Sequence, residues 1–150
     1  MCYLARGDRG HDAVHISART DYAVRAMLVI AEAHPRFVRA AEIATAQQIP
    51  AGFLTSILVD LRRGGLVLSY RGNDGGYGLA RAAEAISLGE ILRVMDGELT
   101  TVRGRPTVAA TYGGTAQGLR EVWISLDEAV SGVVDGVRLA DLVAVGRTGG

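Results

Sequence analysis

The feature that most constrains the fold is a series of three short helical patterns in the first half of the chain. Apolar residues recur at helical spacing from Ser17 until Pro35 ends the pattern. A second pattern covers residues 40–48, and a third begins after Pro50 and ends at Gly64. The apolar stripe of the third pattern predicts its buried face: Phe53, Leu54, Ile57, Leu58 and Leu61.

A β-hairpin is predicted directly after the third helix. Residues 66–70 and 77–81 are β-type runs, and the sequence between them, RGNDGG, has the Asn, Asp and Gly residues that hairpin turns favour. Three helices followed by a hairpin is the order of a winged helix-turn-helix domain. We therefore predict a mainly α fold with a small β-hairpin, and a winged domain over residues 15–97.

The second half of the chain predicts a connector and a long helix. A capping box at Ser87 and Glu90 begins a fourth helix that ends at Gly97. Residues 98–118 have little periodicity and predict a connector, and a loop of that length is usually functional or disordered. Residues 119–145 predict a long helix with a short tail. Its apolar stripe continues to Val137 and includes Leu119, Val122, Trp123, Leu126, Val130 and Val133.

That stripe has two interpretations. The helix could cover the core of the winged domain, or it could pair with the same helix of a second copy. We favour a dimerisation helix, because the stripe is long, follows a long connector, and serves a fold that reads DNA better with two half-sites.

Composition limits the remaining classes. Residues 1–14 show no periodicity and are expected to be a flexible extension. No run approaches the roughly 20 apolar residues of a membrane-spanning helix, and no secretory signal is visible, so we expect a cytoplasmic protein without a membrane partner. Cys2 is the single cysteine, which excludes an internal disulfide and a cysteine-based metal site within one chain.

The charge distribution favours a nucleic-acid partner although the net charge is zero. Residues 1–81 contain ten arginines and seven acidic residues, a net charge of +3, whereas residues 82–150 contain six and nine, a net charge of −3. A cationic front half can face phosphates while the acidic half points away.

We predict that the third helix enters the major groove of double-stranded DNA and that the hairpin reaches the minor groove. Short side chains at the front of the helix allow a close approach, and an arginine on a slim glycine-rich tip can enter a narrow minor groove. Groups at the start of the first helix could hold phosphates. The predicted DNA-binding residues are Ser17, Arg19, Tyr22, Arg25, Gly52, Thr55, Ser56, Arg63, Arg71 and Gly72.

Other functions have weaker support. RGNDGG lies between two strands and not before a helix, so it does not predict a nucleotide-binding loop. His11, His15 and His34 lack metal-ligand spacing, and no catalytic arrangement is visible, so we expect neither a metal, a cofactor nor an enzyme. The alternative that stays open is a winged-helix protein-interaction module that acts as a regulatory partner without binding DNA.

Several segments together resemble one family of regulators: ISARTDYAVRAML, IPAGFLTSILVDLRRGGLV, RGNDGGYGLAR, ISLGEILRVMDG and LADL. Over residues 15 to about 143 the chain resembles the IscR/NsrR/CymR-type (Rrf-two) family of bacterial winged-helix transcription regulators. The resemblance implies a homodimer joined through the long C-terminal helix that binds palindromic promoter DNA, usually as a repressor. It also implies base contacts from Gly52, Thr55 and Ser56 and a minor-groove contact from Arg71.

One departure from the family affects the expected signal. Members that sense iron or nitric oxide carry three cysteines in the stretch that corresponds to residues 98–118, and this chain has none there. Asp21 lies where some relatives place a carboxylate ligand, but one oxygen ligand cannot hold an iron–sulphur cluster. We therefore expect a cluster-free regulator, and a small-molecule effector beneath the connector stays open.

Overall fold

The computed structural model describes residues 15–73 and 75–149, so the expected extension over residues 1–14 and Cys2 lie outside the described residues. The chain forms two compact units. The larger one contains Ile16–Gly97 and Val133–Gly150, and the smaller one contains Glu98–Gly132.

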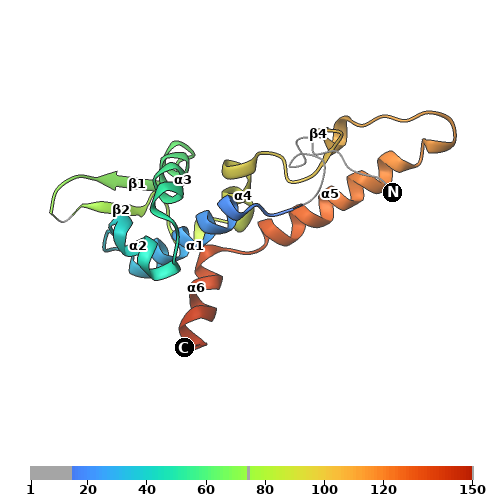
Figure 1. The fold of residues 1–150 in the computed structure, drawn as a ribbon. Helices are drawn as coiled ribbons and strands as arrows, with labels where there is room; N and C mark the ends of the chain where they lie inside the picture. Colours follow the sequence, from blue (N-terminus) through green and yellow to red (C-terminus); the bar gives the residue numbers. More distant parts are fainter. Residues whose placement is uncertain (1–14, 74, 150) are drawn as a thin grey trace. The chain divides into compact units, whose positions relative to one another are not determined.

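The three predicted helices are present in the larger unit (Figure 1): α1 (Ala18–Ala33), α2 (Ala40–Gln47) and α3 (Ala51–Arg63). The Ser17 hydroxyl begins α1 by accepting a hydrogen bond from the Thr20 amide at 3.1 Å. Gln48 ends α2 in the left-handed conformation with φ 53°. The predicted bounds are confirmed to within about one residue.

The predicted hairpin is β1 (Val67–Tyr70) paired with β2 (Gly76–Leu79) in antiparallel register. It is followed by the short helix η2 (Ala83–Ala85) and by α4 (Leu88–Asp96), which begins at the predicted capping box. The last helix, α6 (Leu139–Thr148), is longer than the short tail that the sequence predicted. Its first residue, Leu139, is buried, and the Leu139 amide donates to the Ile86 carbonyl at 3.0 Å.

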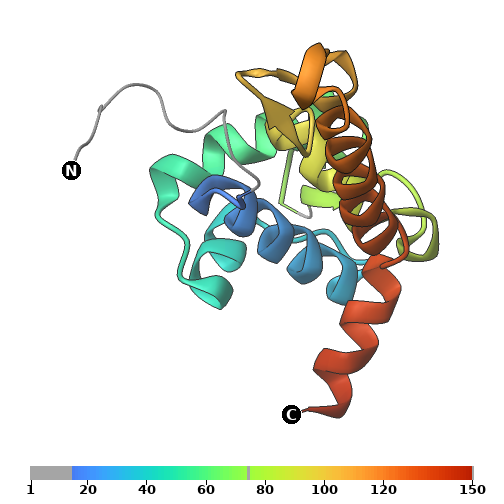
Figure 2. The ribbon, with the colours of Figure 1, turned by 90° about the vertical axis from the view of Figure 1, so that its right-hand side faces the viewer.

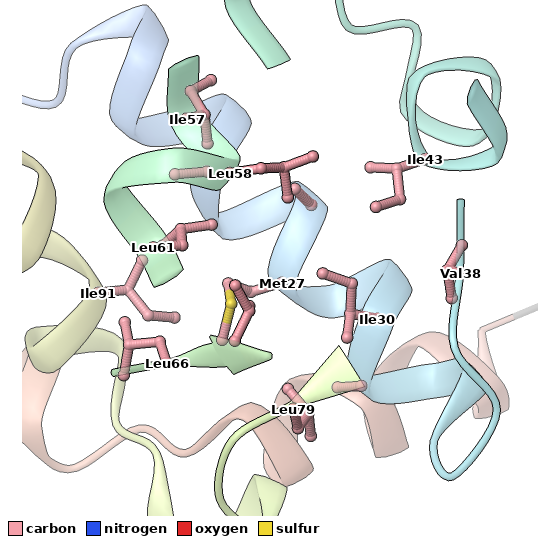
Figure 3. Packing of buried hydrophobic residues seen from close by; sticks show 14 of the residues in the cluster. Met27, Ile30, Val38, Ile43, Ile57, Leu58, Leu61, Leu66, Leu79 and Ile91 are labelled. Atoms are coloured by element: carbon pink, nitrogen blue, oxygen red, sulfur yellow. The ribbon is translucent and has the colours of Figure 1, made fainter. Parts of the chain in front are cut away.

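Helix α1 forms the centre of the larger unit because it packs against α2, α3, α4 and α6 (Figure 2). Figure 3 shows Met27 and Ile30 of α1 beside Leu58 and Leu61 of α3 in the core. All four side chains are fully buried, and each contributes about 1.5–3 kcal/mol through removal of its surface from water.

Phe53 does not lie in this core, and here the sequence prediction was wrong. Its side chain is 52% exposed, whereas its neighbour Leu54 is 2% exposed. At about 100° per helical residue, Phe53 lies roughly 90° from the centre of the buried stripe, at its edge.

The smaller unit has more structure than the predicted connector. It contains a hairpin of β3 (Thr101–Val102) and β4 (Arg105–Pro106), the short helices η3 (Thr107–Ala109) and η4 (Gly114–Ala116), and the beginning of α5 (Leu119–Asp135). The two-residue turn of this hairpin is Arg103 and Gly104, with φ 52° and 72°, as the tight turns of hairpins require.

Side chains of α5 hold the connector within the smaller unit. The Thr100 hydroxyl donates to the Asp127 carboxylate, and the buried Thr107 hydroxyl donates to that of Thr100 at 2.8 Å. The Trp123 indole donates to the Tyr112 hydroxyl at 3.0 Å. The connector is therefore tied to α5 by its own polar groups.

Helix α5 ends at Asp135, so the predicted continuation of its helical stripe to Val137 is wrong. Among the described residues, no helix is both long enough and apolar enough to cross a membrane.

The capping box links α4 to the chain before it. Glu90 accepts from the Ser87 amide at 3.1 Å and from Arg81 at 2.7 Å. Burial raises the pKa of Glu90, but the hydrogen bonds from Arg81 and Ser87 lower it by more, so the net shift is downward from 4.5. Hydrogen bonds from Arg93 lower the pKa of Asp135 in the same way.

We predict that the lowered pKa of Glu90 makes the free energy of unfolding depend on pH. A carboxylate whose pKa is lower in the folded state stabilises the fold above its unfolded pKa, and this contribution is lost as the pH falls through the folded value. Urea unfolding between pH 7 and pH 3 should therefore show a free energy of unfolding that decreases below pH 4.5. Glu90→Gln should lower stability at pH 7 by about 0.5 kcal/mol, allowing for solvent screening, and should flatten this dependence.

The control is Glu84→Gln, because Glu84 is exposed and makes no ion pair with any other described residue. An equal flattening in both variants would contradict the role assigned to Glu90.

Candidate nucleic-acid interface

The outward face of α3 carries the predicted base-facing residues. Gly52, Thr55 and Ser56 are all exposed, as the sequence predicted. Phe53 and Val59 are exposed on the same helix, at 52% and 40%, and sequence analysis missed them as surface residues. The signal that could have found Phe53 is the width of the apolar stripe, which exceeds what one buried face needs.

The start of α1 is joined to this face of α3. Arg19 donates from one guanidinium nitrogen to the Ser56 hydroxyl at 2.7 Å and to the Asp60 carboxylate at 2.5 Å. Ser17 is the helix cap of α1, and its hydroxyl also donates to the Thr20 hydroxyl at 3.0 Å. The predicted phosphate-binding residues Ser17 and Arg19 therefore already have partners inside the protein.

Tyr22 and Arg25 also have internal partners. The Tyr22 ring lies 6.1 Å from the Phe53 ring, measured between centroids, and the Arg25 guanidinium lies 4.8 Å from the Tyr22 centroid. Arg25 Nε lies 3.1 Å from the Asp21 carboxylate, and Nη1 donates to the Gln47 carbonyl. These contacts connect α1 with both α2 and α3.

Two arginines of the winged domain, at the end of α3 and in the hairpin, have no internal partner among the described residues. Arg63 and Arg71 are exposed, and neither makes a hydrogen bond or ion pair within residues 15–73 and 75–149. Gly72 follows Arg71 with φ 108°, a conformation that favours glycine, and it turns the chain at the tip. We call the hairpin β1–β2 with its tip, residues 71–75, the wing.

The wing is held against the loop that precedes α2. The Phe37 ring stacks on Tyr70 of β1 at 4.7 Å between centroids. Val38 exchanges two backbone hydrogen bonds with Tyr77 of β2, at 2.9 Å and 2.8 Å. A Cβ atom at Gly78 would lie 2.3 Å from the Phe37 ring, so this position requires glycine.

This arrangement can bind an anionic polymer. The exposed face of α3 offers small polar groups that allow a close approach, and the unpaired cations Arg63 and Arg71 belong to the same domain. Neutralising phosphates with such cations releases counterions and gives sequence-independent affinity.

The connector does not have the donors of an iron–sulphur cluster. Residues 98–118 contain no cysteine. The polar groups that the connector does bury, Thr100 and Thr107, are hydroxyls already bonded to each other and to Asp127. In the described part of the chain, no three His, Cys, Asp or Glu residues gather as metal ligands would. The residues present therefore do not fit a cluster.

Comparison with known proteins identifies a family of proteins similar to this chain. The model of a family described as Rrf2, iron-dependent transcriptional regulator, matches residues 16–145. A protein of Mycobacterium tuberculosis whose name places it among HTH-type transcriptional regulators is 40% identical over 130 residues, which is 86% of this chain and 81% of its own.

Two solved structures are similar over most of the chain. The structure of CymR, the global cysteine regulator of B. subtilis, superposes with a TM-score of 0.76 at 30% identity, covering 89% of this chain and 98% of that one. IscR of T. potens gives a TM-score of 0.72 at 28% identity and covers 89% of both chains. The predicted fold class, a winged helix-turn-helix with mainly helical structure, is confirmed by these similarities.

We predict that Gly78→Ala destabilises the protein by about 1–3 kcal/mol, because the added methyl group must displace the Phe37 ring from its place on Tyr70. Chemical denaturation measures this change. Gly146→Ala is the matched control, since a Cβ atom there meets nothing within 4 Å and alanine favours the helix by up to about 1 kcal/mol. A Gly78→Ala variant as stable as the parent protein would show that the loop does not hold the wing tightly.

Proposed function

Because the chain belongs to the Rrf2 family of transcriptional regulators, we propose that it is a homodimeric repressor that reads a palindromic operator with α3 and the wing. Members of this family regulate transcription by binding DNA. The observation that carries it is the exposed face of α3 in the same domain as Arg71, which is exposed and has no partner among the described residues.

We assign the base contacts to Gly52, Thr55 and Ser56 in the major groove. Their short side chains make few bidentate hydrogen bonds, and the Thr55 hydroxyl already donates to the Ala51 carbonyl at 3.2 Å. Discrimination between sequences then depends also on the shape of the minor groove, which Arg71 and Gly72 would sense. Arg63, exposed in the last turn of α3, would bind a phosphate.

The groups at the start of α1 take a supporting role in this proposal. Arg19 holds Ser56 and Asp60, and Tyr22 packs beside Phe53, so both fix the position of α3. Ser17 caps α1, and Arg25 holds the end of α2 through the Gln47 carbonyl. Each of these groups therefore already has a partner within the protein.

The proposed dimer forms through α5. No residue of this helix is buried. Four apolar side chains of its stripe are between 40% and 67% exposed: Leu119, Val122, Leu126 and Val133. Trp123 and Val130 are half-buried beside them. A helix of 17 residues that exposes an apolar stripe about 25 Å long needs a cover, and the same helix of a second copy has a complementary stripe.

We propose further that the regulator works without an iron–sulphur cluster, because the connector lacks the required donors, and without catalytic activity, because its relatives are transcriptional regulators. Its signal would then be a small molecule or a partner. Its place of action would be the cytoplasm, as for a regulator of bacterial genes. We assign the DNA-binding winged domain to residues 15–97, the connector to residues 98–118, and the dimerisation helix and tail to residues 119–145.

We predict that Arg71→Ala weakens operator binding by about 1–3 kcal/mol, because it removes the cation that enters the minor groove. Fluorescence anisotropy with a duplex from the protein's own promoter region measures the affinity. Arg147→Ala is the control, since Arg147 is an exposed arginine of α6 without an ion-pair partner among the described residues.

Equal affinities of Arg71→Ala and the parent protein would remove Arg71 from the interface. If the parent protein binds neither this duplex nor any other, and instead forms a stable complex with another protein, the interaction-module alternative is correct.

We predict that Leu126→Glu converts the dimer to a monomer, because each copy would have to bury a carboxylate within the apolar stripe. Light scattering after size-exclusion chromatography measures the mass. Glu128→Lys changes the charge on the other side of α5 and should leave the mass unchanged. A parent protein of monomer mass, or a Leu126→Glu variant of dimer mass, would contradict dimerisation through this stripe.

A further inference from the structure

The tip of the wing is held by a residue outside the hairpin. Arg39 is the last residue before α2, and its side chain reaches the tip from the neighbouring loop. One of its terminal guanidinium nitrogens donates to the Gly72 carbonyl at 2.7 Å and also to the Asn73 carbonyl. These two carbonyls directly follow Arg71 in the chain.

The tip needs such a contact because it lies beyond the paired strands. The last strand pair is Tyr70 with Gly76, so residues 71–73 and residue 75 take no part in the ladder. Within the tip, the Gly75 amide donates to the Gly72 carbonyl at 3.1 Å. With glycines at both ends of this turn, its backbone has many accessible conformations that a fixed partner restricts.

Three consecutive residues of one loop therefore hold three parts of the wing. Phe37 stacks on β1, Val38 pairs with β2, and Arg39 bonds to the tip. Arg36 is a near neighbour with a different role, since both of its terminal nitrogens are bonded to the Glu42 carboxylate, at 3.3 Å and 3.0 Å.

We propose that Arg39 is a positioning residue for the wing, which fixes the tip so that Arg71 is presented to the minor groove in one orientation. The assignment rests on the proposed function. A tip that is ordered before binding loses less conformational entropy when it meets DNA, and this increases affinity without any new contact. In this proposal Arg39 acts through the two backbone carbonyls that it holds, and not as a phosphate ligand.

The test is Arg39→Gln. A hollow of about 240 Å³, lined by Arg36, Phe37, Arg39, Glu42, Asn73 and Gly75, lies beside the contact, so the shorter glutamine would leave the tip carbonyls facing water. In the free protein, amide hydrogen exchange at Gly75, whose amide donates to the Gly72 carbonyl, should become about three- to tenfold faster, as loss of a single hydrogen-bonded contact implies. Affinity for the promoter duplex should fall by a similar factor.

Two comparisons separate positioning from a direct phosphate contact. Arg36→Gln removes the same charge three residues away and should leave exchange at the tip unchanged. The slope of log affinity against log salt concentration should be the same for Arg39→Gln and the parent protein, whereas loss of a phosphate contact would reduce it by about one.

Unchanged exchange at the tip in Arg39→Gln would overturn the proposal, and so would a reduced salt slope. If the parent protein fails to bind DNA, the proposed function is wrong. The exchange measurement, which needs no DNA, still decides whether Arg39 holds the tip.

Discussion

The structure of the larger unit depends on the burial of α1. Met27 and Ile30 contact a core to which α3, α4 and both wing strands contribute, and α2 and α6 pack against the same helix. A helix enclosed on several sides cannot rotate or shift without opening cavities, and each lost methylene group costs free energy. The orientation of α3 is fixed by this packing, so its outward face is a rigid surface and not one that forms on binding.

That rigidity determines which polar groups can take part in recognition. The sequence predicts Arg19 and Arg25 as phosphate-binding residues, yet they join α1 with α3 and α2. Arg63 and Arg71 have no such partner among the described residues and keep their full capacity for a ligand. A guanidinium that is already paired with a carboxylate, as Arg19 is with Asp60 and Arg25 is with Asp21, attracts a phosphate less strongly than one that is not.

The sequence predicted what local chemistry controls. Pro35 and Pro50, the Ser87 capping box and the RGNDGG turn locate the elements almost to the residue, because each acts within one turn of a helix or hairpin. It did not predict contacts between distant segments. The pairs Arg19 with Asp60 and Arg39 with Gly72 are separated by 41 and 33 residues and depend on tertiary packing, so periodicity carries no trace of them. The prediction for Phe53 was wrong for a related reason. Whether a residue at the edge of an apolar stripe is buried depends on the segment that packs beside it, and helical spacing does not show that segment.

A net charge of zero is compatible with binding a polyanion because the charge is not evenly distributed, and ion pairs neutralise six of the sixteen arginines locally. Arginines at positions 19, 25, 36, 81, 93 and 120 each lie in an ion pair with a nearby carboxylate, so at the length scale of a groove they contribute little field. An approaching phosphate is attracted mainly by the arginines that have no ion-pair partner among the described residues. On α3 and the wing these include Arg63 and Arg71. The distribution of unpaired charge, and not its sum, therefore determines which face of the domain attracts DNA.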